Sequence, residues 1–202
     1  MGPCDWSANG DLLYVVIENE GSALGTVPVA GGKEPVRLAE LQSQWTMAKF
    51  SLDARWLAYV DERGGAPQVF LESNPPGRGR RQISTDGGID PHWRRDGREL
   101  FYVDPRGRMM SVEVKLGESI EAGVPQELFT FRHMNNAYMT SWYDVTGDGQ
   151  RLLIPTPLEG TPSGPMSGPE LDEGVQAMSF LGPSRTIAIL RCRAIGMRSG
   201  CG

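Results

Sequence analysis

Hydrophobic and polar positions follow one motif that recurs four times along the chain. In each copy an aromatic residue precedes a short polar turn, and an apolar stretch follows the turn. The copies read DWSANGDLLYVV from Asp5, KFSLDARWLAYV from Lys49, HWRRDGRELFYV from His92 and WYDVTGDGQRLLIP from Trp142. Their aromatic residues, at intervals of 44, 43 and 50 residues, are Trp6, Phe50, Trp93 and Tyr143. Self-similarity at such an interval predicts a repeat protein.

Each position of the motif has a structural interpretation. Glycine ends the turn at Gly10, Gly97 and Gly149, where a positive φ is cheapest for a residue without a Cβ atom. Ala54 stands there in the second copy, so we expect that turn to be slightly strained or of another type. After the turn, every second residue should lie on one buried face of a strand. This predicted column contains Leu13, Leu57, Leu100 and Leu152, followed two residues later by Val15, Tyr59, Tyr102 and Ile154.

Further short strands are predicted between these motifs, separated by turns rich in Gly and Pro. They span residues 24–29, 36–41, 68–72, 81–84, 109–114 and 127–131. Several strands in each interval of about 40 to 50 residues are typical of a β-propeller blade. We therefore predict an all-β fold, a β-propeller of about three and a half four-stranded antiparallel blades in a partial or small ring. The aromatic column should fill the space between blades, because no single blade can bury both of its faces alone.

The second and third copies resemble the TolB-like, WD-repeat-like propeller units of bacterial proteins. The resemblance rests on residues 50–60, 81–88 and 90–97, followed by Glu99-Leu100-Phe101-Tyr102. The resemblance extends over roughly residues 4–158. This part of the chain is similar to the C-terminal propellers that follow bacterial Ser/Thr kinase domains. The chain departs from the family in two features. The family's turns carry Pro before Asp or Asn, whereas none of the four turns here does. The family's rings usually hold six or seven blades, whereas about three and a half are predicted here. The chain is therefore either a fragment of a longer product or an unusual small ring.

The chain divides into two parts of different composition. Residues 1–158 form the predicted blades. Residues 159–202 form a connector rich in Gly and Pro, with one closing strand predicted at 186–190 and an end that we expect to be disordered.

Composition narrows the classes of partner and compartment. The formal net charge of -5, with both signs mixed along the chain, argues against binding to nucleic acid or to an anionic membrane. No stretch approaches the ~18 apolar residues of a membrane span, and residues 1–11 lack the features of a signal peptide. Localisation is thus unknown from the chain, although the resemblance implies the periplasm or another place outside the cytoplasm. Cys4, Cys192 and Cys201 form no CxxC pair, so neither a zinc site nor a disulfide scaffold is predicted.

The sequence contains no complete motif for catalysis or cofactor binding. Residues 144–149 begin like a calcium loop, but Pro155 stands at the twelfth position, where a bidentate Glu is required. Residues 31–34 lack the earlier Gly and the Ser or Thr of a phosphate-binding loop. The sequence also contains neither a GxSxG nucleophile elbow nor the kinase motifs. We therefore predict no catalytic residue, no cofactor and no metal.

Four residues are candidates for contact with a partner: Asp90, His92, Trp45 and Trp142. Asp90 and His92 alternate on a predicted inner strand, which lines the central channel of a propeller. The usual interpretation of a lone histidine is a partly solvated strand residue. Trp45 and Trp142 precede hallmark strands instead of lying in a buried column. The arginines at 78, 80, 81, 94 and 95 are interpreted as solubilising charge on loops and turns.

The function predicted from the resemblance is non-enzymatic binding of a protein or peptide by a TolB-like propeller module. The alternative is a sensor or accessory propeller that belongs to a multidomain Ser/Thr kinase or prolyl-oligopeptidase-like hydrolase. An incomplete ring would also leave strand edges exposed, which favours self-association.

Overall fold

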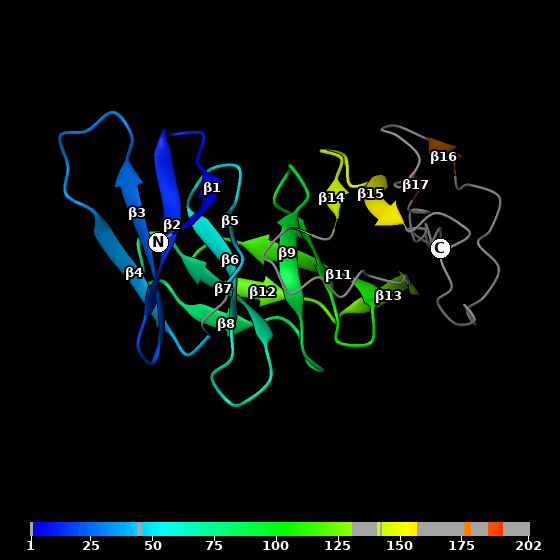
Figure 1. The fold of residues 1–202 in the computed structure, drawn as a ribbon, viewed down its shortest axis with the longest axis horizontal. Helices are drawn as coiled ribbons and strands as arrows, with labels where there is room; N and C mark the ends of the chain where they lie inside the picture. The colour runs from blue at the N-terminus through cyan, green and yellow to red at the C-terminus, as the bar shows by residue number, and fades with distance from the viewer. Residues whose placement is uncertain are drawn as a thin grey trace, which may run out of the picture.

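Four antiparallel β-sheets follow one another along the chain (Figure 1). A computed structural model describes residues 2–43, 46–130, 141, 143–156, 176–178 and 186–191. Every regular element within these residues is a β-strand. These residues therefore contain no helix that could cross a membrane. We name the sheets blades 1 to 4 in chain order.

The blades have the strand order of a propeller. Blade 1 contains β1 (Gly2–Trp6), β2 (Asp11–Glu18), β3 (Gly21–Pro28) and β4 (Val36–Leu41). Blade 2 contains β5 (Ala48–Phe50), β6 (Trp56–Asp61), β7 (Gln68–Ser73) and β8 (Arg80–Gln82). Blade 3 contains β9 (Ile89–Trp93), β10 (Glu99–Val103) and β11 (Arg108–Leu116), and the two ends of β11 pair with β12 (Ile120–Ala122) and β13 (Gln126–Thr130). Blade 4 contains β14 (Asp144–Val145), β15 (Arg151–Thr156), β17 (Thr186–Arg191) and β16 (Gln176–Met178). The sequence did not predict β12 or β16, whereas β17 covers the predicted closing strand.

The blades pack face to face, with their first strands on a shared inner side. β5 contacts both β1 and β9, and β9 contacts β14. An apolar core fills each of the three junctions. The cores include Leu13, Val15, Leu24 and Leu57 between blades 1 and 2; Trp56, Ala58, Leu71 and Leu100 between blades 2 and 3; and Phe101, Val103, Leu152 and Ile154 between blades 3 and 4. Blades 2 and 3 thus bury both faces against neighbours, which confirms the predicted all-β propeller class.

The turn after the first strand is one residue shorter in blade 1 than in the other blades. In blade 1 the N–H of Ser7 donates to the carbonyl four residues later, that of Asp11, at 2.8 Å. In blade 2 the N–H of Ser51 donates to the carbonyl five residues later, that of Trp56, at 2.9 Å. The longer turn recurs in blades 3 and 4. A shift of one residue moves every side chain to the opposite face of a strand.

The predicted burial of Leu13 and Val15 is confirmed, but their place in the strand column is wrong. The blade 1 residue equivalent to Leu57 is Leu12, one position before the predicted Leu13, and Tyr14 replaces Val15 as the next member of the column. Leu13 and Val15 lie on the other face and pack against blade 2. The column is correct in blades 2, 3 and 4, whose turns have equal length.

The predicted aromatic column needs correction at both ends of the chain. In blade 4 the position belongs to Val145, which pairs with Leu152, and Tyr143 is buried two residues earlier. Phe50 fills the junction between blades 1 and 2 as predicted, with 7% of its surface exposed. Trp6 is 59% exposed, because no described blade lies against its face of blade 1.

The alanine in the second turn adopts the conformation of the glycines in the others. Ala54 has a φ of 56°, and Gly10, Gly97 and Gly149 have φ values of 85°, 71° and 72°. A residue with a Cβ atom is strained in this left-handed region. Of the two expectations for this turn, strain within the same turn type is thus the correct one.

Candidate functional site

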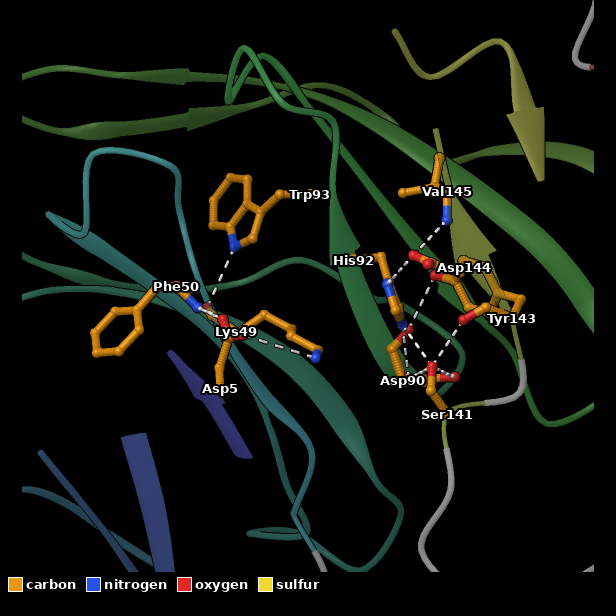
Figure 2. A network of polar contacts seen from close by, with 10 residues as sticks. All are labelled: Asp5, Lys49, Phe50, Asp90, His92, Trp93, Ser141, Tyr143, Asp144 and Val145. Carbon is orange, nitrogen blue, oxygen red and sulfur yellow. Dashed lines mark hydrogen bonds and ion pairs between the residues drawn. The ribbon is translucent and has the colours of Figure 1, made fainter. Parts of the chain in front are cut away.

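One position of the inner strands forms a row of ionisable side chains across the four blades. Asp5, Lys49, His92 and Asp144 each precede the residue of the aromatic column. Asp5 Oδ1 lies 3.9 Å from Lys49 Nζ, and His92 Nδ1 lies 3.8 Å from Asp144 Oδ1. Figure 2 shows these two pairs as parts of separate polar networks on neighbouring inner strands.

The first network joins blades 1, 2 and 3 through backbone groups. Asp5 Oδ2 accepts a hydrogen bond from the N–H of Phe50 at 2.8 Å. The indole Nε1 of Trp93 donates to the carbonyl of Lys49 at 3.3 Å. Each of these contacts crosses from one blade to the next, so the network fixes how the inner strands align.

The second network joins blade 3 to blade 4 around a buried carboxylate. Asp90 is 1% exposed and has a positive φ of 54°. Its two carboxylate oxygens each lie 3.0 Å from Ser141 Oγ, and one lies 3.1 Å from His92 Nε2 (Figure 2). Its carbonyl accepts a hydrogen bond from the hydroxyl of Tyr143 at 2.9 Å. Both the carboxylate and the backbone of Asp90 are therefore engaged across the junction.

Tyr143 is the apolar wall of this network. Its ring centroid lies 4.5 Å from that of His92, with a tilt of 45° between the rings. Burial raises the pKa of the Tyr143 hydroxyl well above its usual range, and the charges of Asp90 and Asp144 add to this effect. The hydroxyl therefore stays protonated and acts as a hydrogen-bond donor.

The contact between Ser141 and His92 has only part of the geometry of a nucleophile and its base. Ser141 Oγ lies 2.7 Å from His92 Nε2, a distance that suits proton transfer. A Ser-His-Asp relay also needs a hydrogen bond from Nδ1 to a carboxylate, and here Nδ1 lies 3.8 Å from Asp144. In addition, Asp90 competes for the serine hydroxyl through both of its oxygens. The arrangement is thus suited to hold two blades together, and it lacks the Nδ1 hydrogen bond that orients the histidine of such a relay.

The predicted partner-binding residues have different outcomes. Asp90 and His92 come together on β9, but both are buried, so a contact of either with a partner stays a prediction. Trp45 and Trp142 lie outside the described residues. Sequence reasoning missed Ser141, although the repeat carries one signal for it: Thr46 occupies the same position in blade 2 and donates to the carbonyl of Val60 at 2.6 Å.

The predicted solubilising role of the arginines fails at Arg80. Its guanidinium lies 2.8 Å from the buried carboxylate of Asp61 and donates to the hydroxyl oxygen of Tyr59, also at 2.8 Å. The guanidinium carbon lies 3.9 Å from the ring centroid of Phe70. Arg80 is therefore a structural residue that covers the edge of the core between blades 1 and 2.

The calcium-like loop is the turn of blade 4. The carboxylate of Asp148 accepts hydrogen bonds from the Thr146 hydroxyl at 2.5 Å and from the N–H of Gln150 at 3.0 Å. Both bonds reach the same oxygen, Oδ1, which is therefore used within the turn. Across the described ranges, no group of three His, Cys, Asp or Glu residues is placed to hold a metal ion.

A cleft of about 810 Å³ lies where the turn of blade 2 meets that of blade 3. The cleft is lined by residues of both turns and of the end of β11, including Leu52, Asp53, Arg55, Arg94, Arg95, Asp96, Arg98, Glu113, Lys115 and Leu116. Five cationic side chains thus face three carboxylates, which leaves the cleft positively charged. Leu52 is 55% exposed and gives the rim an apolar element.

The cations of this cleft are of two kinds. Arg94 is held by Asp96 at 2.7 Å and by Glu99 at 2.8 Å, and its guanidinium lowers the pKa of the Asp96 carboxyl below the usual value. Arg95 and Arg98 are exposed, and within the described part of the chain neither has a carboxylate within ion-pair distance. These two guanidinium groups are therefore the ones available to an anionic group.

A second, smaller hollow of about 330 Å³ has the opposite charge. It lies at the other end of the strands, between the β2–β3 turn and the end of β4, and is lined by Glu18, Glu20, Glu40 and Arg63 among others. Arg63 donates to the carbonyl of Glu40 at 2.8 Å. The cleft and this hollow thus differ in electrostatic character.

Four-stranded antiparallel blades that stack around shared inner strands define a β-propeller. Solved structures of other proteins share this arrangement. TolB from Acinetobacter baumannii matches 93% of this chain with a TM-score of 0.61 and 16% identity. A tricorn protease matches 83% of the chain (TM-score 0.53, 12% identity), which corresponds to 15% of the protease chain. A chain of a nidogen/laminin complex matches 76% of it (TM-score 0.52, 13% identity), corresponding to 55% of that chain.

These likenesses confirm a TolB-like propeller as the fold, and at such low identity they show the fold alone. The present chain spans 42% of the length of the Acinetobacter TolB chain. The sequence itself matches no protein-family model and no curated protein.

Proposed function

We propose that this propeller is a non-enzymatic module that binds a protein or peptide in the cleft between the turns of blades 2 and 3. The observation that carries the proposal is the pair of exposed guanidinium groups, Arg95 and Arg98, at a cleft with an apolar rim. Guanidinium groups bind carboxylates through charge-assisted, often bidentate, hydrogen bonds. The partner segment is therefore acidic, with an apolar side chain that packs on Leu52.

The size and rigidity of the cleft support this assignment. Its volume of about 810 Å³ is within the range of ligand-binding clefts, roughly 300 to 1,000 Å³. The internal pair of Arg55 with Asp53, at 2.6 Å, and the pairs of Arg94 order the walls before any partner arrives. Preordered walls reduce the entropy lost on binding.

The test is a titration of the chain with a fluorescein-labelled peptide of alternating Glu and Leu residues. We expect saturable binding that weakens with added salt, because the contacts are exposed charge pairs. The variant Arg95→Glu/Arg98→Glu should weaken binding about tenfold or more.

A matched control changes the same charge elsewhere. Arg78 and Arg106 are also exposed but do not line the cleft, so Arg78→Glu/Arg106→Glu should change affinity less than about twofold. Equal losses in the two double variants would show a general charge effect and contradict the proposal. So would equal affinity for a peptide of alternating Lys and Leu residues.

A further inference from the structure

The short turn of blade 1 contains the one Asn-Gly sequence of the chain, Asn9-Gly10. The residues equivalent to Asn9 in the longer turns are aspartates, namely Asp53, Asp96 and Asp148. Each of these carboxylates accepts a hydrogen bond from the N–H two residues later, at 3.1, 3.0 and 3.0 Å. An Asp or Asn side chain that binds its own backbone in this way is fixed within the turn.

The longer turns contain a separate N–H for each of their polar side chains. In blade 2 the N–H of Arg55 donates to the carboxylate of Asp53. The N–H of the next residue, Trp56, donates to Ser51 Oγ at 3.1 Å. Blade 4 repeats both bonds. Two side-chain acceptors are thus matched by two backbone donors.

The turn of blade 1 lacks one residue and with it one of these donors. The N–H of Asp11, two residues after Asn9, donates to Ser7 Oγ at 2.9 Å instead. Within the described part of the chain, the side chain of Asn9 has no hydrogen-bond partner. Its amide is therefore free to turn toward the backbone nitrogen of Gly10.

This turn position is open to water even where a blade has a neighbour on both sides. Asn9 is exposed, and so are its equivalents Asp53 and Asp96 in the two inner blades. Gly10 has no Cβ atom, and no atom lies within 4 Å of the place where one would be. Water and hydroxide can thus reach the Asn9 amide and the nitrogen that follows it.

We propose that the short turn makes Asn9-Gly10 a site of spontaneous deamidation in the folded protein. The Gly10 N–H leaves its 3.1 Å bond to the Ser7 carbonyl and loses its proton to hydroxide. The nitrogen then attacks Cγ of Asn9, so that an N–Cγ bond forms, the Cγ–Nδ2 bond breaks and ammonia leaves. Water adds to the resulting succinimide and opens it, at Cγ to give aspartate or at the backbone carbonyl carbon to give isoaspartate.

The reaction changes both the charge and the length of the turn. Either product supplies blade 1 with the carboxylate that the other three turns already carry. The isoaspartate product also adds one carbon to the backbone of the shortest turn. No co-reactant other than water is needed, and ammonia is the only molecule released.

The first test incubates the folded 202-residue chain at mildly alkaline pH and follows its asparagines by peptide mass spectrometry. We expect Asn9 to gain the mass of an amide converted to an acid, at a rate that rises with pH. Asn74 is the internal control, because its amide donates to the Ala54 carbonyl at 2.8 Å and the following Pro75 has no N–H. Loss of the amide at Asn74 as fast as at Asn9 would contradict the proposal. So would an intact Asn9 in the folded chain when a peptide of residues 6–12 deamidates under the same conditions.

A matched variant places the same dipeptide in a longer turn of the same molecule. In Asp148→Asn the N–H of Gln150 and the hydroxyl of Thr146 are in place to hold the side-chain oxygen. This site should deamidate about fivefold more slowly than Asn9, the factor by which one net hydrogen bond lowers the population of a free side chain. Equal rates at the two sites would overturn the proposal, because the dipeptide and not the short turn would then set the rate.

A second variant guards against an effect of the first on folding. Asp96→Asn creates the dipeptide in blade 3, where the N–H of Arg98 is the donor, and should show the same slower rate. Circular dichroism melts of both variants should match that of the parent chain. Asn9 does not line the cleft of the proposed function, so a failure of peptide binding leaves this test intact.

Discussion

The junction between blades 1 and 2 and the junction between blades 3 and 4 use the same inner-strand positions in different ways. Ala48 in blade 2 and Tyr143 in blade 4 are equivalent residues, and both are buried. Ala48 simply packs in an apolar core, whereas the Tyr143 hydroxyl is bound to the backbone of Asp90. One repeat position can therefore be filled by apolar contact or by a polar network.

This difference has an energetic consequence. The apolar junction contains one inner-strand carboxylate, Asp5, whose side chain is 25% exposed and therefore partly hydrated. The polar junction depends on Asp90, which water does not reach. Buried polar networks strengthen a structure when every member is bonded, and they destabilise it when one member is lost. The polar junction should thus be the more sensitive to substitution.

The largest effect is expected from Asp90→Ala. The variant leaves His92 and Ser141 without their shared acceptor, and Ala tolerates the positive φ of this position less well than Asp does. We expect the free energy of unfolding to fall by about 3 kcal/mol. Asp5→Ala, the comparison at the other junction, should lower it by about 1 kcal/mol. Urea denaturation measures both, and equal losses would contradict the distinction between the junctions.

Alkaline pH should destabilise all three junctions next, because each buries a tyrosine: Tyr59 between blades 1 and 2, Tyr102 between blades 2 and 3, and Tyr143 between blades 3 and 4. Burial raises the pKa of Tyr143 well above its usual range and, with the charge of Asp104, raises that of Tyr102 to about 12. An unfolded tyrosine titrates near pH 10. The stabilisation is therefore fully present below pH ~10 and is lost as pH rises through the folded-state pKa, by about 1.4 kcal/mol per pH unit for each group.

Two phenylalanine variants assign this loss. Tyr143→Phe removes the bond to the Asp90 carbonyl, so it should lower the free energy of unfolding by about 1 kcal/mol at neutral pH and make the alkaline loss less steep. Tyr102→Phe should make the loss less steep with a smaller change at neutral pH. Urea denaturation over a pH series provides the measurement. An unchanged slope in both variants would mean that other groups cause the alkaline loss.

The fold could be predicted because its signals are local. Turn glycines, alternating strands and the repeat interval are readable within each motif. Register in blade 1 could not be predicted, because residues 12–16 are all apolar and suit either face of the strand. A single missing turn residue then reversed the faces, and nothing in Asn9-Gly10 distinguishes its turn from that of Asp96-Gly97.

The candidate site was only partly predictable for a different reason. Asp90 and His92 are visible as polar residues on an inner strand, but their partner Ser141 comes from the next blade, about 50 residues away. The pairing of Arg80 with Asp61 was likewise hidden, since it joins two strands across a blade. Sequence pattern predicts which face a residue occupies, and it does not predict which side chains meet across a junction.

The smallest effect is expected at Ala54, in a comparison of one turn position at the two junctions. At Gly149 a Cβ atom would lie 2.7 Å from Arg94 Cδ, and Arg94 is fixed by two carboxylates, so Gly149→Ala should lower the free energy of unfolding by about 1 to 2 kcal/mol. At Ala54 the methyl group is buried in the apolar core, with only 5% exposed. Ala54→Gly relieves a strained φ but removes a buried methyl of similar worth, about 0.8 kcal/mol, so stability should change by less than about 0.5 kcal/mol. Thermal denaturation of both variants gives the comparison, and a loss at Ala54 as large as that at Gly149 would show that packing, and not strain, dominates the apolar junction.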